Sequence, residues 1–432
     1  MNNTNTVCLL NDSFPPLIDG VANTVMNYAN FIPCNGYVPI VITPDHPDAD
    51  DKPYPYDVLR YPSIDIRKKT GYMAGIPFSP EMARQIKSQN VQILHSHCPI
   101  VSTMLARQLR QIMDVPLILT YHTKFDIDIE NILHNPALRA GSKKILIENI
   151  KSCDEVWAVS QGAAENLRSL GYEGECVIMP NGVDFPLGRA GDDQIAAATT
   201  GYDLPTNIPV YLFVGRMKWY KGQRIILDAL AKLNAAGKNF RMVFIGSGAD
   251  LSEIQDYAKI SGIADKCIFT GAIHDREKLR AWYCRADLFL FPSTYDTNGL
   301  VVREAAACSV ATVMIRNSCA AEGILDGRNG FLIDENAESL YTRLLSLNDR
   351  MDVMHQIGRT AAQEIYISWD TAVKNATERY EIVIDRYKNG AYPVHRKPMD
   401  VVFGAHGELM EDLGQLLELR DQARKRFKDR WE

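Results

Sequence analysis

The chain has 432 residues, of which 46% are apolar and 23% charged, and its formal net charge is -6. This length is too great for one compact core and predicts two domains of about 150–200 residues each. The acidic balance argues against a nucleic-acid partner, because neutralising phosphates requires concentrated lysine and arginine.

The cysteines and the apolar runs indicate where the protein works. Nine scattered cysteines without any C-x-x-C spacing are typical of reduced thiols in a cytosolic protein. The N-terminus has no basic segment followed by an apolar one, and no later run reaches about 18 apolar residues. We therefore expect a protein that stays inside the cell and crosses no membrane, although it can still lie on one.

The first half of the chain alternates short β-branched runs with helix-like stretches, the pattern of a parallel sheet covered on both faces. The expected strands are TVCLL, YVPIVIT, VQILHSH, PLILTYH, EVWAVS and CVIMP. Residues 181–209 are rich in Gly, Pro and Asp and indicate a linker. The pattern then restarts with PVYLFVGR, FRMVFIG, KCIFTGA, DLFLFPS, ATVMIR and GFLID.

Polar residues follow several strands of the first half. Asp19 and Gly20 open a helix after the first strand, where a ligand can approach a parallel sheet. His122 follows the strand PLILT, and His95 and His97 belong to HSHCP. A metal site built from these histidines is disfavoured, because no carboxylate or cysteine stands at a recognised ligand spacing from them.

The loop GRMKWYKG follows the strand VYLFV in the second half. Gly215 lets the chain turn, and Arg216 and Lys221 bring two cations to the strand end, which suits a diphosphate leaving group. Two solvated cations on an ordinary loop are the alternative. The glycine-rich turn FIGSGAD, residues 244–250, would allow a ligand to approach the backbone closely, although it lacks the G-x-G-x-x-G pattern.

The segment STYDTNGLVVREAAAC follows the strand DLFLFP. Asn298 and Gly299 stand where a helix should start, so its free N–H groups and dipole suit an anion. Asp296 precedes the helix and Glu304 lies in it, and carboxylates of this kind accept hydrogen bonds from sugar or ribose hydroxyls. An acidic helix start and a solvated helix residue are the alternative.

Two amphipathic stretches end the chain. In SWDTAVKNATERYEIVIDRY the apolar residues at helical spacing, expected to run back to the first domain, are Ala372, Val373, Ala376, Tyr380, Ile382 and Val383. In the last segment an apolar stripe of Leu409, Leu413, Leu416, Phe427 and Trp431 is surrounded by Arg420, Arg424, Lys425, Arg426, Lys428 and Arg430. This helix, RKK at 67–69 and residues 138–152 suit a membrane surface, whereas solvated cations and packing on the body or a twin subunit are the alternative.

In their order along the chain these motifs resemble those of the retaining glycosyltransferases of family 4, which have the GT-B fold. FPPLIDG resembles the N-terminal glycine loop, YHTKFD the sugar-contacting histidine segment, and VSQGAAENL with MPNGVD the end of the first domain. VGRMKWYKG resembles the phosphate-binding G-R-x-x-x-x-K-G, and DTNGLVVREA the E-x7-E element. The resemblance covers about residues 7–385 and includes the branch that glycosylates diacylglycerol.

The resemblance implies an α/β GT-B protein with two Rossmann-like domains facing across a cleft. The acceptor domain would be residues 1–195, joined by the C-terminal helices of about 370–432. The nucleotide-sugar donor domain would be residues 206–369.

Roles for the donor phosphates follow from the same resemblance. Arg216 and Lys221 would clamp the diphosphate of a nucleotide sugar. The backbone around Gly299, Leu300 and Val301 would hold the distal phosphate at the start of a helix. No metal site is implied.

Further residues would bind the sugars. The resemblance makes Glu304 the ligand of the ribose hydroxyls and Asp296 that of the donor sugar's hydroxyls. His122 would contact the transferred sugar, and Gly20 would leave room for phosphate or acceptor. Glu322 stands where the family often has an acidic residue.

The implied reaction moves a hexose from a nucleotide diphosphate sugar, a UDP-sugar in preference to a GDP-sugar, to an acceptor hydroxyl with retention at the anomeric carbon. No metal or other cofactor is implied. The expected acceptor is a membrane lipid or a cell-envelope glycan precursor, and the expected location is the cytoplasm or the inner face of the membrane. The oligomeric state is not defined.

Several positions depart from the family pattern. Asp296 replaces a glutamate, Asn298 replaces a phenylalanine, and Asp19 replaces the first glycine of the N-terminal pair. The family's G-x-P after Glu304 is replaced by residues 309–311, Ser-Val-Ala. These departures leave open a catalytically silent GT-B protein that acts as partner or chaperone of another glycosyltransferase. An epimerase or phosphorylase is disfavoured, because no further set of catalytic carboxylates or pyridoxal lysine signature is evident.

Overall fold

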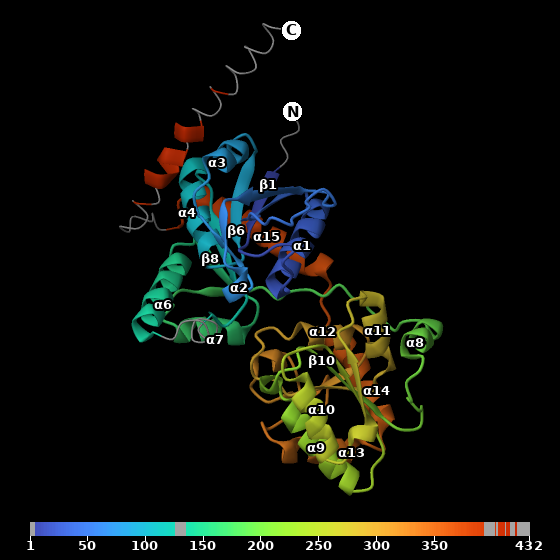
Figure 1. The fold of residues 1–432 in the computed structure, drawn as a ribbon. Coiled ribbons are helices and arrows are strands. Elements are labelled where there is room, and N and C mark those ends of the chain that lie inside the picture. Colours follow the sequence, from blue (N-terminus) through green and yellow to red (C-terminus); the bar gives the residue numbers. More distant parts are fainter. Residues whose placement is uncertain are drawn as a thin grey trace, which may run out of the picture. The chain divides into compact units, whose positions relative to one another are not determined.

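The computed structural model describes residues 5–125, 135–392, 402, 405–410, 412–414 and 420. The chain forms two compact units (Figure 1). The first combines residues 1–180 with residues 369–432, and the second spans residues 181–368.

The first unit is built on a parallel sheet of seven strands in the order β3-β2-β1-β6-β7-β8-β9. Its strands are β1 (Asn5–Leu10), β2 (Tyr37–Pro44), β3 (Asp57–Tyr61), β6 (Val91–Ser96), β7 (Leu117–Tyr121), β8 (Glu155–Ala158) and β9 (Cys176–Ile178). An antiparallel pair, β4 (Ser63–Asp65) and β5 (Met73–Gly75), is separate from it. The strand order reverses between β1 and β6, where doubly wound sheets bind their ligands.

Helices cover this sheet. They are α1 (Gly20–Phe31), α3 (Pro80–Lys87), α4 (Val101–Met113), α6 (Pro136–Lys151), α7 (Gln161–Ser169) and α15 (Trp369–Lys388), with the short α2 (Arg67–Thr70) and the 3-10 turn η1 (Ile32–Asn35). The helix α15 belongs to this unit and packs beside α1 (Figure 1). Its expected apolar face is buried except for Ile382, which is 47% exposed, so that residue was wrongly assigned to the packing face.

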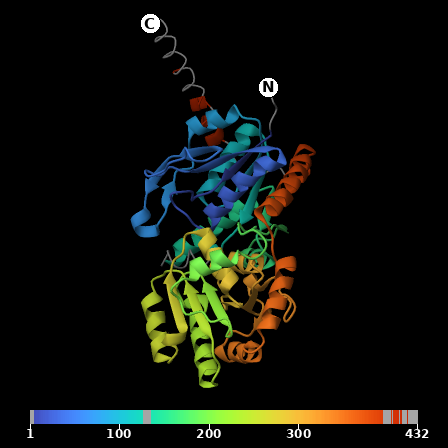
Figure 2. The same cartoon turned by 90° about the vertical axis from the view of Figure 1, so that its right-hand side faces the viewer.

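The second unit contains a parallel sheet of six strands in the order β12-β11-β10-β13-β14-β15. Its strands are β10 (Val210–Val214), β11 (Arg241–Ile245), β12 (Cys267–Gly271), β13 (Leu288–Phe291), β14 (Ala311–Ile315) and β15 (Phe331–Ile333). Figure 2 shows these strands side by side with helices around them. The reversal of strand order falls between β10 and β13.

The second unit's helices come before, between and after these strands along the chain. They are α8 (Asp192–Thr199), α9 (Gln223–Ala235), α10 (Leu251–Ile260), α11 (Arg276–Arg285), α12 (Leu300–Ala307), α13 (Ala337–Leu347) and α14 (Met351–Glu364), with 3-10 turns η2 (Trp219–Lys221), η3 (Ala264–Lys266) and η4 (Cys319–Ala321).

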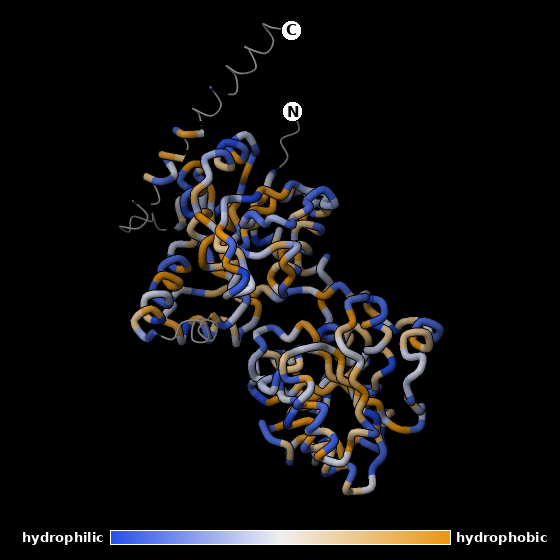
Figure 3. The backbone as a smooth tube through the Cα atoms, in the orientation of Figure 1, coloured by the Kyte–Doolittle hydropathy of each residue, from blue (hydrophilic) through white to orange (hydrophobic). Residues whose placement is uncertain are grey.

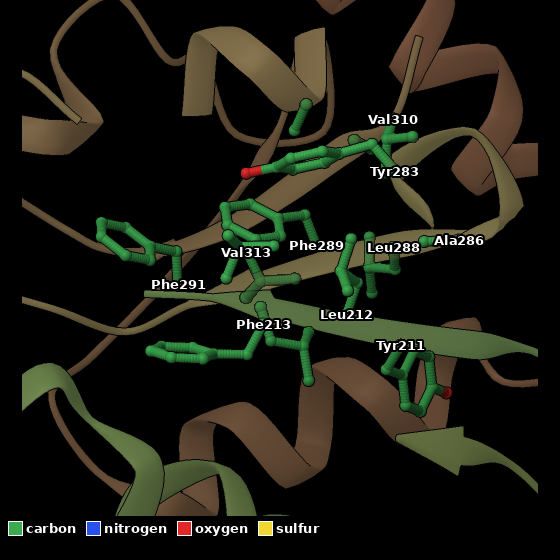
Figure 4. Close-up of a cluster of buried hydrophobic side chains, with 14 of the residues drawn as sticks. Tyr211, Leu212, Phe213, Tyr283, Ala286, Leu288, Phe289, Phe291, Val310 and Val313 are labelled. Carbon is green, nitrogen blue, oxygen red and sulfur yellow. The ribbon is translucent and has the colours of Figure 1, made fainter. Parts of the chain in front are cut away.

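Apolar side chains on the strands form a core in each unit. Figure 3 shows hydrophobic stretches of the backbone, in orange, within each unit. In the second unit Phe213 of β10 and Phe289 and Phe291 of β13 meet under Tyr283 of α11 (Figure 4). Burial on both faces accounts for the continuous apolar runs in the sequence.

The expected linker at residues 181–209 is instead part of the second unit. It contains α8, which packs on α11, and its Phe185, Ala190 and Ile195 are buried in the core. Three spaced apolar residues are enough to fix a segment whose overall composition resembles that of a linker.

The described part of the C-terminal segment packs on the first unit. Residues 405–410 and 412–414 are helical, and Met410 is fully buried with its sulfur accepting the N–H of Ser79 at 3.2 Å. Gly407 and Gly414 lie against backbone of α4 and α3, where a Cβ would be 3.0 Å and 3.1 Å from the nearest carbonyl oxygen.

The expected apolar stripe was therefore wrong at Leu409, which is 48% exposed. Leu416, Phe427, Trp431 and the cations from residue 424 onward lie outside the described residues. Among the helices that the structure describes, none is both long and apolar enough to cross a bilayer. The nine cysteines all lie within the described residues, and none of them forms a disulfide.

Candidate active site

The loops with the strongest chemical signals meet at one edge of the second unit's sheet. The loop carrying Arg216 and Lys221 follows β10, and the segment carrying Asp296 and Gly299 follows β13. Because β10 and β13 are paired parallel neighbours, the two loops leave the same edge of the sheet at its reversal point.

Lys221 and Asp296, to which the sequence assigned separate tasks, form a direct ion pair. The Nζ atom of Lys221 lies 2.6 Å from Oδ1 of Asp296, and the lysine is only 6% exposed. The Oγ of Ser293 donates to the other oxygen of Asp296 at 2.6 Å, and the Lys221 ammonium lies 5.2 Å from the ring centroid of Tyr295. The ion pair places one cation and one carboxylate beside the start of α12.

Arg216 lies on the exposed rim of the same loop. Its carbonyl oxygen accepts a hydrogen bond from Nε2 of Gln223 at 3.0 Å, which fixes the backbone. Within the described ranges its guanidinium forms no ion pair, so the structure does not bring it into the Lys221–Asp296 cluster. An exposed guanidinium can still move toward an anion.

The start of α12 has the properties of an anion site. Gly299 precedes the helix with φ +57° and ψ +49°, and a Cβ there would lie 2.9 Å from that of Ala320. No side chain caps this helix, and α9 and α10 of the same unit also lack a side-chain cap, whereas Asp275 caps α11 and Asn336 caps α13. The first-turn N–H groups at Leu300 and Val301 are thus left for a ligand.

Glu304 is held by two residues that the sequence did not reveal. It is 8% exposed; the Tyr283 hydroxyl donates to its Oε2 at 2.9 Å, and Nη2 of Arg276 donates to its Oε1 at 2.5 Å. Arg276 also pairs with Asp184. Burial raises the pKa of Tyr283 well above its usual value, which keeps its hydroxyl a donor. A carboxylate fixed in this way still has lone pairs for hydroxyl groups.

Two other predicted positions flank this region. The side-chain amide of Asn298 is buried, and in the described part of the chain neither its nitrogen nor its oxygen has a hydrogen-bond partner. Glu322 is exposed, and its charge acts on the half-buried Arg303 of α12. Neither residue joins the Lys221–Asp296 pair.

The glycines of residues 244–250 serve a different purpose from the one expected. A Cβ at Gly246, where φ is +141°, would lie 1.9 Å from the carbonyl oxygen of Gly215, and one at Gly248 would lie 2.3 Å from that of Met217. The neighbouring loop therefore fills the space that the sequence assigned to a ligand. Gly246 and Gly248 thus allow the backbone of residues 215–217 to pack directly on this turn, which fixes the loop that carries Arg216 and Lys221.

Replacing Gly246 by alanine should disturb the packing of this turn on residues 215–217. We expect a loss of about 2–3 kcal/mol in the free energy of unfolding, because the backbone conformation suits only glycine and a carbonyl blocks the new methyl group. Gly237→Ala is the matched control: it also has a positive φ of +76° but meets nothing within 4 Å, so about 1 kcal/mol is expected. Denaturant titration of both variants measures the difference, and equal losses would contradict the packing argument.

Three histidines of the first unit are stacked at the carboxyl ends of β6 and β7. The rings of His95 and His97 are 4.1 Å apart between centroids, and Nδ1 of His97 is 3.0 Å from Nε2 of His122. Hydrogen bonds join His95 to Tyr380 of α15 at 2.6 Å and to Thr120 at 2.7 Å.

Burial keeps these three rings neutral. It lowers the pKa of His122 to about 3 and that of His95 and His97 well below the usual value. Among the described residues no three His, Cys, Asp or Glu side chains form a group that could hold a metal ion.

Asp19 and Gly20 stand at the start of α1. Asp19 caps the helix, and its Oδ1 accepts the N–H groups of Val21 and Ala22 at 2.9 Å and 2.8 Å. A Cβ at Gly20 would meet nothing within 4 Å, and the role of this glycine toward a ligand stays a prediction. The residue that replaces the first glycine of the family pair is therefore a helix cap.

The model of Glycosyltransferase Family 4 matches residues 18–185, and that of Glycosyl transferases group 1 matches residues 200–364. The chain belongs to the family 4 glycosyltransferases. The two matches fall on the first and second Rossmann-like units of this glycosyltransferase, respectively.

Relatives of this glycosyltransferase differ in their substrates. It is 24% identical over 376 residues to the alpha-monoglucosyldiacylglycerol synthase of Acholeplasma laidlawii, covering 83% of this chain and 94% of the relative. It is 26% identical over 335 residues to the GDP-mannose-dependent alpha-mannosyltransferase of Corynebacterium glutamicum, covering 76% of each.

A solved structure supports the fold of this glycosyltransferase. Anabaena HepE in complex with UDP superposes with a TM-score of 0.70 at 17% identity, covering 87% of this chain and 100% of the other. The predicted α/β GT-B architecture with two Rossmann-like domains is confirmed.

Proposed function

We propose that this glycosyltransferase moves a hexose from a nucleotide diphosphate sugar to an acceptor hydroxyl with retention at the anomeric carbon. The observation that carries the proposal is the uncapped start of α12 with Lys221, Asp296 and Glu304 beside it. A helix start of this kind suits a phosphate, and the carboxylates suit sugar hydroxyls.

The donor would bind on the second unit through its phosphates. The N–H groups at Leu300 and Val301 would hold the distal phosphate, and Lys221 and the exposed guanidinium of Arg216 would neutralise the remaining charge. Glu304, fixed by Tyr283, would accept hydrogen bonds from the ribose.

The same groups would lower the barrier to transfer. Negative charge grows on the departing diphosphate, so donors aimed at it interact more strongly in the transition state than before it. The departing phosphate would take the proton of the acceptor hydroxyl on the face from which it leaves. Retention then requires no pair of carboxylates of the glycosidase type and no metal or other cofactor.

Asp296 and His122 would contact the transferred hexose. Asp296 would accept hydrogen bonds from its hydroxyls once Lys221 turns toward the phosphate. His122 would act as a neutral ring, because burial lowers its pKa to about 3. We therefore expect no step in the pH dependence of transfer from His122 between pH 5 and 8.

A UDP-sugar is the proposed donor. Support comes from HepE, which was crystallised with UDP, whereas the Corynebacterium relative is named for GDP-mannose. The choice of base rests on these likenesses and on the sequence resemblance.

The proposed acceptor is a membrane lipid or a cell-envelope glycan precursor, reached from the cytoplasm or at its membrane face. The Acholeplasma relative is named as a synthase of a glucosylated diacylglycerol. On α6, Leu138 and Ile145 are 59% and 52% exposed and Lys144 is exposed, which suits an anionic lipid surface. The guanidinium of Arg67 is less available to lipid, because it is paired with Asp65 and Asp48.

Donor cleavage tests the proposal. The purified chain is incubated with UDP-glucose, UDP-galactose and GDP-mannose, with and without EDTA, and the released nucleotide is measured. We expect slow hydrolysis of a UDP-sugar, unaffected by EDTA, and an α-configured anomeric signal in the released or transferred hexose before mutarotation.

Two outcomes would overturn parts of the proposal. An inverted product would exclude retention. Nucleotide binding without cleavage of any donor, also in the presence of lipid and glycan acceptors, would favour the silent partner of another glycosyltransferase.

A further inference from the structure

Two aspartates occupy the carboxyl edge of the first unit's sheet. Asp12 follows β1 but caps α4, the helix after β6. Its oxygens accept the N–H of Val101 at 3.1 Å and that of Ser102 at 2.7 Å, with further bonds from the hydroxyl of Ser102 and the thiol of Cys98. The start of α4 therefore already holds an anion that belongs to the chain.

The second carboxylate is that of Asp19. Besides capping α1, it accepts the hydroxyl of Ser13 on Oδ2 at 2.8 Å. The amide of Asn11 in turn donates to the carbonyl and hydroxyl oxygens of Ser13, at 2.7 Å and 3.1 Å. This network fixes Asp19 and leaves a lone pair of Oδ2 for another donor.

The start of α7, the helix after β8, is also occupied, since the hydroxyl of Ser160 accepts the N–H of Ala163 at 3.0 Å. The helices that follow β1, β6 and β8 thus all have capped first turns. The second unit differs, because α12 after β13 has no side-chain cap.

Asp12 and Asp19 bring two negative charges to this edge, and Lys124, three residues after β7, brings one positive charge. In the part of the chain that the structure describes, neither Asp12 nor Asp19 forms an ion pair, and both raise the pKa of the Cys98 thiol in addition to its burial. Arg60 donates to the carbonyl of Pro15 at 2.8 Å, but its charge is matched by Asp51. His97 and His122 are neutral.

We propose that the acceptor binds this edge as an uncharged alcohol, a glycerol or sugar hydroxyl with no phosphate beside it. This rests on the proposed transfer to an acceptor hydroxyl. Oδ2 of Asp19 can accept a hydrogen bond from such a hydroxyl, whereas a phosphate would meet two carboxylates and helix starts that are already filled.

Binding of inorganic phosphate tests the exclusion directly. The full chain, with ¹⁵N-labelled histidine and saturating UDP, is titrated with phosphate while the ring signals of His97 and His122 are recorded. We expect no saturable shift up to about 10 mM. A saturable shift of either ring in the wild-type protein would overturn the proposal.

A variant that removes only the charge of Asp19 tests whether that charge excludes phosphate. Asp19→Asn retains a good N-cap but removes the charge, so phosphate should now bind in the millimolar range. Asp192→Asn, at the exposed start of α8 in the second unit, is the matched control and should behave as wild type. If Asp19→Asn excludes phosphate as fully as the wild type, the charge of Asp19 is not the cause and the proposal fails.

Matched acceptors distinguish the two sources of the alcohol. Labelled UDP-glucose is offered with diacylglycerol or phosphatidic acid in detergent micelles, and with a methyl glucoside or its 6-phosphate in solution. We expect the uncharged member of the productive pair to react at least about tenfold faster; a faster phosphorylated member overturns the inference. If no donor is cleaved in any arm, the proposed function fails, and the phosphate titration still decides the character of this edge.

Discussion

Lys221→Ala should lower the turnover of donor sugar by about 100- to 1,000-fold, the loss typical when a group that stabilises developing negative charge is removed. The effect should fall on kcat more than on KM, because the ammonium interacts most strongly with the departing phosphate. Steady-state release of nucleotide from UDP-sugar, measured beside UDP affinity by calorimetry, checks both parts.

The control lies in the same loop. Lys218 pairs with Asp250 at 3.1 Å and is 35% exposed, so Lys218→Ala removes an equal charge outside the site. It should change turnover by at most about fivefold, since a surface ion pair contributes at most about 1 kcal/mol. Equal losses in both variants would mean that general loop charge, and not the position of Lys221, matters.

Acid should unfold the first unit before the second. The neutral histidines of the stack have folded-state pKa values lowered by burial, while in the unfolded chain they titrate near 6.5. Stability is therefore complete above pH 6.5 and falls as the pH decreases, because the unfolded state takes up protons that the folded state refuses. Three such groups approach a slope of about 4 kcal/mol per pH unit between pH 6 and 5.

Hydrogen exchange by mass spectrometry at pH 7, 6 and 5, corrected for intrinsic rates, measures the protection of backbone amides in each unit separately. Peptides from β6 and β7 should lose protection first, because the described residues of the second unit include no buried histidine. His97→Asn should lessen the slope of the first unit by about one third. Parallel loss in both units would contradict the assignment to the stack.

The architecture could be predicted because the strands of both sheets are buried on both faces. Their apolar runs, such as those ending at Leu10 and Val214, need no knowledge of partners. The strand β3 was missed because it is at the edge of its sheet and includes Asp57 and Arg60. The segment at residues 181–209 was misjudged because composition does not show which few apolar residues become buried.

The sequence predicted which loops form the candidate site, but not which side chains in those loops contact one another. Strand ends placed Lys221, Asp296 and Glu304 at one edge, yet the pairing of the first two depends on the distance between loops 75 residues apart. Tyr283 and Arg276 carry no motif, and only the packing of α11 beside α12 brings them to Glu304. The roles of these residues in binding stay predictions.

The ion pair of Lys221 has a consequence for selectivity among anions. Asp296 is tethered beside the ammonium, so its effective concentration there is on the order of millimolar or above, and a free phosphate ion must outcompete it with a single contact. A nucleotide sugar contacts the start of α12, Glu304 and the hexose-binding groups at the same time, so it can displace Asp296 from Lys221. A hydroxyl of the bound hexose can then donate a hydrogen bond to the displaced carboxylate. The carboxylate would thus act as a built-in competitor that protects the donor site from the inorganic phosphate of the cell.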